Sequence, residues 1–138
     1  MNRAMTDPVL PQANLGFSSP VKVMIVDDSA FMRFSIAHHL NEHPEIKVVG
    51  SAHNGKEALR LIPELQPDLV IMDGRMPGMD GVEATRMIKV KWPHMKVILL
   101  SMYPEYREAA YQAGADSFIS KGETPEKLLE AICAVLNC

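Results

Sequence analysis

Several features that mark other classes of protein are scarce in this chain of 138 residues. It has only two cysteines, Cys133 within an apolar helical pattern and Cys138 at the end, so we expect inert thiols without metal or redox function. No apolar run reaches the roughly 20 residues that span a bilayer. The net charge is −3 without a basic cluster, which argues against nucleic-acid binding by this chain alone. These absences exclude a membrane span and a lone nucleic-acid binder.

The remaining composition is typical of one globular domain with a real core. Hydrophobic residues make up 47% of the chain and charged residues 22%. The first twenty residues include Pro8, Pro11 and Pro20 but no apolar secretory core. We therefore expect a flexible arm over residues 1–20, a folded domain over 21–138, and a cytoplasmic location.

Each of four short apolar runs ends at a polar position. The runs are 21–26 before Asp27 and Asp28, 69–72 before Asp73, 97–100 before Ser101, and 117–120 before Lys121. Such runs are typical of strands buried on both faces of a parallel sheet, where the active crevice lies outside the carboxyl ends. The fold would therefore bring three acids, a hydroxyl and an amine together, which predicts a site for a divalent metal and a phosphoryl group.

Helix patterns alternate with these runs and with a further strand predicted at residues 46–52. Helices are expected at about 29–42, 56–65, 82–92 and 104–113, and from 124 onward. The apolar positions of the first helix are Phe31, Phe34, Ile36, Ala37 and Leu40. Five strands, each followed by a helix, predict a doubly wound α/β sandwich.

These motifs, taken in order, resemble the receiver domain of two-component response regulators over residues 21–136. The matching segments are Val-Asp-Asp-Ser at 26–29, Met-Asp at 72–73, Met-Pro-Gly-Met-Asp-Gly at 76–81, Ser101, Ala-Gly-Ala-Asp at 113–116, and Phe-Ile-Ser-Lys at 118–121. The segment that follows the first strand suits a chemotaxis-type regulator or methylesterase. The resemblance implies a flavodoxin-like, five-stranded parallel sheet in the order 2-1-3-4-5, flanked by five helices.

The resemblance also implies how a phosphoryl group would be received. Asp73 would be the nucleophile that takes it from a phosphohistidine of a sensor kinase or phosphotransfer protein, or from a small acyl phosphate. Mg²⁺ would relieve the repulsion between the anions. Asp28 and Asp73 would bind the ion directly, Asp27 would act through water, and the backbone carbonyl of Arg75 would complete the protein ligands.

Other residues would hold the phosphoryl group or respond to it. Ser101 would offer a hydroxyl donor and Lys121 a compact positive charge to the phosphoryl oxygens. Ser101 and Phe118 would form the conformational switch that changes a face for a downstream effector protein. Arg75 and Tyr103 are expected to overhang the site and slow hydrolysis. Beyond its own phosphorylation and slow dephosphorylation, we expect no enzymatic activity.

Three alternatives stay open at this point. The chain could be the front portion of a longer DNA-binding or methylesterase regulator. A phosphatase of the haloacid dehalogenase type also uses an aspartate and Mg²⁺, but it needs a second aspartate where this chain has Arg75. A flavodoxin-like cofactor binder would need a hydroxyl-rich loop after the first strand, where this chain has acids.

The segment between Ser101 and Gly114 is about two residues shorter than is usual in the family. We therefore expect a stunted fourth helix of roughly two turns, with tyrosines 103, 106 and 111 on or near its face. Many relatives dimerise through this face, so we expect the unphosphorylated chain to be mainly monomeric.

Overall fold

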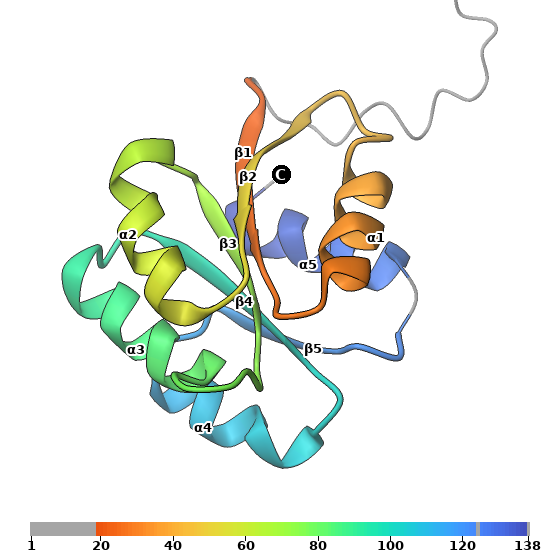
Figure 1. The fold of residues 1–138 in the computed structure, drawn as a ribbon. Helices are drawn as coiled ribbons and strands as arrows, with labels where there is room; N and C mark the ends of the chain where they lie inside the picture. The colour runs from red at the N-terminus through yellow and green to blue at the C-terminus, as the bar shows by residue number, and fades with distance from the viewer. Residues whose placement is uncertain (1–18, 124, 138) are drawn as a thin grey trace, which may run out of the picture.

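The computed structural model of the chain describes residues 19–123 and 125–137, and the expected arm therefore lies mostly outside the described residues. Five parallel strands form one sheet in the order β2-β1-β3-β4-β5, as predicted (Figure 1). The strands are β1 (Val21–Val26), β2 (Ile46–Ala52), β3 (Leu69–Asp73), β4 (Lys96–Ser101) and β5 (Ser117–Ser120). The helices are α1 (Ala30–Leu40), α2 (Gly55–Leu65), α3 (Gly81–Lys91), α4 (Arg107–Gln112) and α5 (Pro125–Leu136). Among the described residues, no helix is long and apolar enough to cross a membrane.

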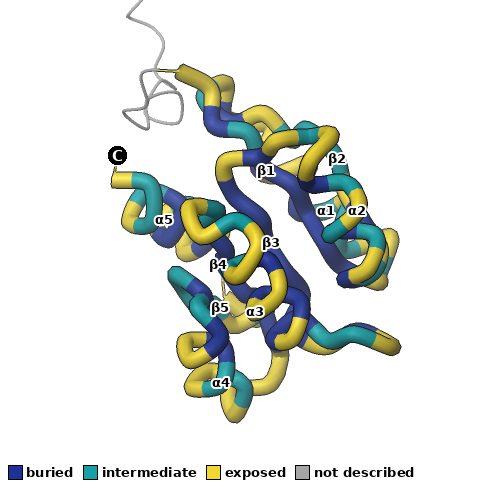
Figure 2. The backbone as a smooth tube through the Cα atoms, turned by 90° about the vertical axis from the view of Figure 1, so that its left-hand side faces the viewer, coloured by how far each residue is buried: buried dark blue, intermediate teal, exposed yellow. Residues whose placement is uncertain are grey.

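Helices cover both faces of the sheet, and the strands are buried from both directions (Figures 1 and 2). Alternate strand residues point to opposite faces. Met24 and Val70 face the core under α2, α3 and α4, whereas Val23 and Leu69 face the core under α1 and α5. This burial explains why the strands read as continuous apolar runs.

Polar side chains start three of the helices. The side chain of Ser29 accepts a hydrogen bond from the Met32 amide, at 3.2 Å, at the start of α1. Asn54 caps α2 and Asp80 caps α3 in the same way. Capping satisfies backbone donors that have no partner within the helix, and it fixes where each chain segment leaves the sheet.

Two expectations about side chains were wrong. Phe31 and Phe34 were expected among the inward positions of α1, but they are 77% and 76% exposed. At 3.6 residues per turn they lie about 140° and 160° around the helix from the buried Ile36, on the solvent side. In α5, Cys133 is disulfide-bonded and is not an inert thiol, whereas Cys138 lies outside the described residues.

The fourth helix is short, as predicted. A 3-10 turn at Pro104–Tyr106 precedes α4, which has six residues. The helix ends before Gly114, whose φ of +106° suits a residue without a side chain. Near β5, one face of the sheet is therefore covered by the shortest helix, α4, while the other face packs against α5.

Candidate functional site

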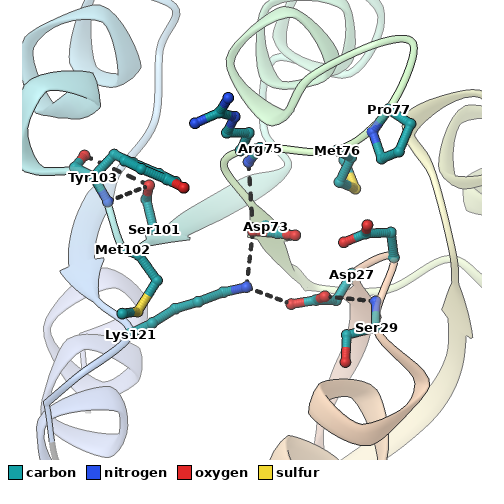
Figure 3. Close-up of a pocket in the computed structure, with 11 residues that line it drawn as sticks. Asp27, Ser29, Asp73, Arg75, Met76, Pro77, Ser101, Met102, Tyr103 and Lys121 are labelled. Carbon is teal, nitrogen blue, oxygen red and sulfur yellow. Dashed lines mark hydrogen bonds and ion pairs between the residues drawn. The ribbon is translucent and has the colours of Figure 1, made fainter.

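The carboxyl ends of four strands open into one pocket of about 500 Å³. Asp27, Asp28, Asp73, Ser101 and Lys121 all line it, together with residues of the loop that follows β3 (Figure 3). The structure thus brings together the five side chains that the sequence placed at strand ends.

Strand register explains why these side chains meet. Val26 of β1 pairs with Met72 of β3, so Asp27 and Asp73 follow at the same level of neighbouring strands. Asp73 lies beside Leu100 of β4, and Ser101 lies beside Ser120 of β5. Lys121 is the next residue, so its long side chain starts at the edge of the sheet and reaches across toward the acids.

Three carboxylates form the acidic part of the pocket. One oxygen each from Asp27, Asp28 and Asp73 lies within 4.8 Å of the others. Asp27 and Asp73 are almost completely buried, whereas Asp28 is exposed. The Lys121 Nζ lies 3.0 Å from Asp27 Oδ2 and 3.0 Å from Asp73 Oδ1 (Figure 3). A single ammonium cannot neutralise three carboxylates, so the cluster has the chemistry of a site for a hard cation.

The pocket shifts the proton affinities of its charged groups. Burial and the charge on Asp27 raise the pKa of Asp73 to about 6, against the opposing effect of the hydrogen bond and charge of Lys121. Burial lowers the pKa of Lys121, but the bonds and charges of Asp27 and Asp73 outweigh it, so the net pKa lies above the ordinary value. At neutral pH Asp73 is therefore mostly an ionised carboxylate beside a charged lysine.

A second group of residues lies across the pocket from the Asp27–Asp28 loop. Ser101 is buried, and its Oγ accepts a hydrogen bond from the Tyr103 amide at 3.0 Å. The Arg75 guanidinium lies over the Tyr103 ring, 4.7 Å from its centre. Arg75 and Tyr103 both line the pocket (Figure 3), and their contact joins the loop after β3 to the loop after β4.

Phe118 does not line the pocket but lies in the core under α4. Its amide donates a hydrogen bond to the Tyr111 hydroxyl at 3.1 Å, and the Arg107 guanidinium lies 5.8 Å from the centre of its ring. Strand β5 is thus tied to α4 through its own backbone. Ser101 and Phe118 lie on adjacent strands and both are almost fully buried.

Three residues shape the site through contacts that the sequence did not specify, although Gly81 lies in the matching segment 76–81. A side chain at Gly81 would overlap the Asp73 carbonyl oxygen, and one at Gly74 would lie 3.0 Å from the Ser101 Cβ. Arg33 donates a hydrogen bond from its guanidinium to the Asp27 carbonyl oxygen at 2.7 Å. Gly74 directly follows Asp73, which was a visible signal, but neither close approach can be deduced from the sequence of one chain.

Comparison with known proteins agrees with this geometry. The family model for the response regulator receiver domain matches residues 23–133. The chain therefore belongs to the response regulator receiver family, whose members are signalling proteins of two-component systems. Receiver domains bind Mg²⁺ at an acidic cluster, and this chain has such a cluster in Asp27, Asp28 and Asp73.

Three relatives show how similar this chain is to individual response regulators. The response regulator protein VraR of Staphylococcus saprophyticus is 41% identical over 120 residues, which are 86% of this chain and 57% of that protein. The response regulator domain of Thermotoga maritima CheB is 34% identical, with a TM-score of 0.79 over 86% of this chain and 98% of that chain. A LuxR-family response regulator from Aurantimonas sp. SI85-9A1 is 33% identical, with a TM-score of 0.82 over 86% of each chain. The chain thus spans little more than half the length of VraR.

Proposed function

We propose that the chain is a phosphorylation-activated switch in which Asp73 receives a phosphoryl group from a sensor histidine kinase or phosphotransfer protein. The observation that carries this proposal is the position of Asp73. Its carboxylate lies 3.0 Å from a charged lysine and within 4.8 Å of two other carboxylates, in a pocket open to a donor. The cytoplasm, where such donors act, is the expected location.

The donor set fits Mg²⁺, which prefers carboxylate, carbonyl and water oxygens. Asp28 and Asp73 would bind it directly, Asp27 through water, and the Arg75 backbone carbonyl would add another oxygen. When bound, the ion would offset the negative charge that gathers as one anion attacks another.

The chain's own residues would supply the rest of the reaction. An Asp73 oxygen attacks phosphorus while the phosphorus–nitrogen bond of the phosphohistidine breaks, and the imidazole leaves with its electron pair. The Lys121 ammonium would hold one phosphoryl oxygen, and the Ser101 hydroxyl would donate to another. The Ser101 hydroxyl now donates to the Tyr103 carbonyl oxygen at 3.5 Å, so its proton would turn from that oxygen to the phosphoryl group.

Labelling with acetyl phosphate tests the chemistry. With Mg²⁺, we expect the wild type to gain one acid-labile phosphoryl group by mass spectrometry, and Asp73→Asn to gain none. Asp68→Asn is the matched control, because Asp68 lies at the opposite end of β3 and is exposed. Asp28→Ala should label slowly and need more Mg²⁺, since a direct ligand is lost. Undiminished labelling of Asp73→Asn would refute the assignment.

The proposed switch couples this site to the face formed by α4, β5 and α5. Ser101 would move toward the phosphoryl group, and Phe118 would fill the space that it leaves. Packed cores favour two discrete arrangements over gradual deformation. Adding beryllofluoride with Mg²⁺ should shift amide resonances on this face, and Ser101→Ala should reduce those shifts. Unchanged resonances in wild type that binds the mimic would show that no coupling exists.

We also propose that this chain is the receiver portion of a longer response regulator. VraR is longer than this chain, and a similar structure is described as a DNA-binding response regulator of the LuxR family from Staphylococcus aureus. Similarity to the CheB domain favours the methylesterase alternative instead. Either way this chain would be the receiver portion, and its downstream effector would be a protein or an attached domain. The phosphatase alternative is disfavoured because Asp73 follows β3 instead of the first strand.

A further inference from the structure

Arg33 lies in the second turn of α1, outside the group of residues that line the pocket. Its Nη1 donates a hydrogen bond to the Asp27 carbonyl oxygen at 2.7 Å. Among residues 19–123 and 125–137, no carboxylate pairs with this half-buried guanidinium. A permanent positive charge is therefore directed at one backbone carbonyl in the loop that carries two of the three acids.

Hydrogen bonds and an ion pair fix the position of Asp27, whereas the side chain of Asp28 in the same loop has no such contact with a described residue. Asp27 donates its amide to Ala52 O at 3.1 Å, and its Oδ1 accepts from the Ser29 amide at 2.9 Å. Its Oδ2 faces Lys121. By contrast, no hydrogen bond or ion pair with a described residue holds the exposed Asp28 side chain. The direction of Asp28 therefore depends on its backbone.

That backbone starts at the peptide unit which Arg33 contacts. The Asp27 carbonyl and the Asp28 amide share one planar group, so fixing the carbonyl oxygen also fixes the plane that enters Asp28. Turning this plane would swing the Asp28 Cα–Cβ bond away from Asp27 and Asp73. We propose that Arg33 is a positioning residue that aims the Asp28 carboxylate at the cation held by the acidic cluster. This inference rests on the proposed metal-dependent function of the site.

Two possible roles of Arg33, as a nearby positive charge and as a positioning residue, predict opposite changes in Mg²⁺ affinity when Arg33 is replaced. Removing a positive charge near three carboxylates should, by Coulomb attraction alone, strengthen Mg²⁺ binding. Losing the hydrogen bond to Asp27 should weaken it, because the Asp28 ligand is no longer aimed. Residues that orient metal ligands typically change affinity by tenfold or more. The sign of the change therefore separates the two roles.

The experiment titrates MgCl₂ into the full chain and follows backbone amides by NMR. We expect Arg33→Met to raise the Mg²⁺ dissociation constant about tenfold, and Arg33→Lys, which can still donate a hydrogen bond, to give a value between those of wild type and Arg33→Met. In the metal-free state, Asp28 and Ser29 amides should shift or broaden in Arg33→Met, while amides of β4 and β5 stay in place. Arg60→Met is the matched control, since Arg60 is exposed on α2 and pairs with Glu57.

The results separate this inference from the proposed function. If wild type binds Mg²⁺ and Arg33→Met binds it equally or more tightly, the positioning role is wrong while the metal site stands. If wild type binds no Mg²⁺ at millimolar concentration, the proposed function itself fails and the inference fails with it. If Arg33→Met does not fold, Arg33→Lys carries the test, and wild-type affinity with unshifted Asp28 amides would overturn the proposal.

Discussion

The two sides of the pocket are built on different parts of the sheet. The carboxylate side comprises Asp27 and Asp28, which follow β1, and Asp73, which ends β3; each of these strands has a neighbour on both sides. The hydroxyl side comprises Ser101, which ends β4, and Tyr103 and Lys121, which follow β4 and β5. Strand β5 lies at the edge and has four residues. The carboxylate side thus has the more complete support.

This difference suits the two tasks that the pocket would perform. Ligands of a small, hard cation must keep fixed positions, and interior strands supply them. A switch needs elements that move at low cost, and such elements come from less stable parts of a fold. On the hydroxyl side, β5 is held on one face by the short α4, partly through the hydrogen bond from the Phe118 amide to the Tyr111 hydroxyl. Similar substitutions on the carboxylate side and on the hydroxyl side should therefore differ in their effects on stability and function.

The largest expected effect is on stability, from Gly81→Ala on the carboxylate side. The added methyl group would overlap the Asp73 carbonyl oxygen, which cannot move without displacing β3. We expect a loss of about 3 kcal/mol in the free energy of unfolding, measured in urea. Gly122→Ala on the hydroxyl side is the control, because its methyl group would meet only Ser120 Oγ at 3.8 Å. Equal losses of unfolding free energy in Gly81→Ala and Gly122→Ala would contradict the proposed difference between the two sides.

The second effect concerns pH. The pKa of Asp73 rises from 3.8 to about 6 on folding, so the folded state binds more protons than the unfolded chain between these values. Stability of the metal-free protein should therefore fall as pH rises through this window. Asp73→Asn removes the effect and should stabilise the protein at pH 7.5 by about 1–2 kcal/mol, allowing for solvent in the pocket.

The extra stability of Asp73→Asn relative to wild type should decrease as pH is lowered toward 4, where wild-type Asp73 is protonated in the folded state. Urea unfolding in EDTA at several pH values measures this trend. Asp68→Asn, at the other end of β3, should not show it. A variant that is less stable than wild type at pH 7.5 would show that Asp73 contributes favourably to folding.

The third effect is on phosphoryl lifetime. Arg75 and Tyr103 stack at the pocket, where their bulk should impede the water that attacks phospho-Asp73. Replacing both with alanine should speed hydrolysis about twofold to fivefold, which corresponds to a barrier lower by about 0.5–1 kcal/mol. The decay of the labelled protein gives the half-life, with Arg86→Ala on α3 as a control. Equal half-lives in wild type and the double variant would refute this role.

The smallest expected effect is on association. We expect the short α4 to alter the face through which receiver domains would dimerise, so sedimentation should find the unmodified chain mainly monomeric. Measurement before and after beryllofluoride addition would then show whether phosphorylation changes the state. A tight dimer in the unmodified state would contradict this interpretation of α4, although not the proposed chemistry of Asp73.

Much of the site was predictable because its signals are local. A run of apolar residues identifies a buried strand, and the residue after it must lie at the carboxyl edge of the sheet. Asp73, Ser101 and Lys121 were placed in this way, and the short interval before Gly114 predicted the reduced α4. The expectation for Phe31 and Phe34 was wrong because their apolar character does not reveal which side of α1 meets the sheet.

The sequence by itself determined the strand ends and the residue types available for chemistry, since each depends on neighbours a few positions apart. Only the tertiary structure decided the contact of Arg33 with the Asp27 carbonyl, the stacking of Arg75 on Tyr103, and the close approach of Gly81 to Asp73. Those contacts depend on how far each loop travels after its strand and on how closely helices pack. Such distances follow from the packing of the whole domain and are not encoded by any one segment.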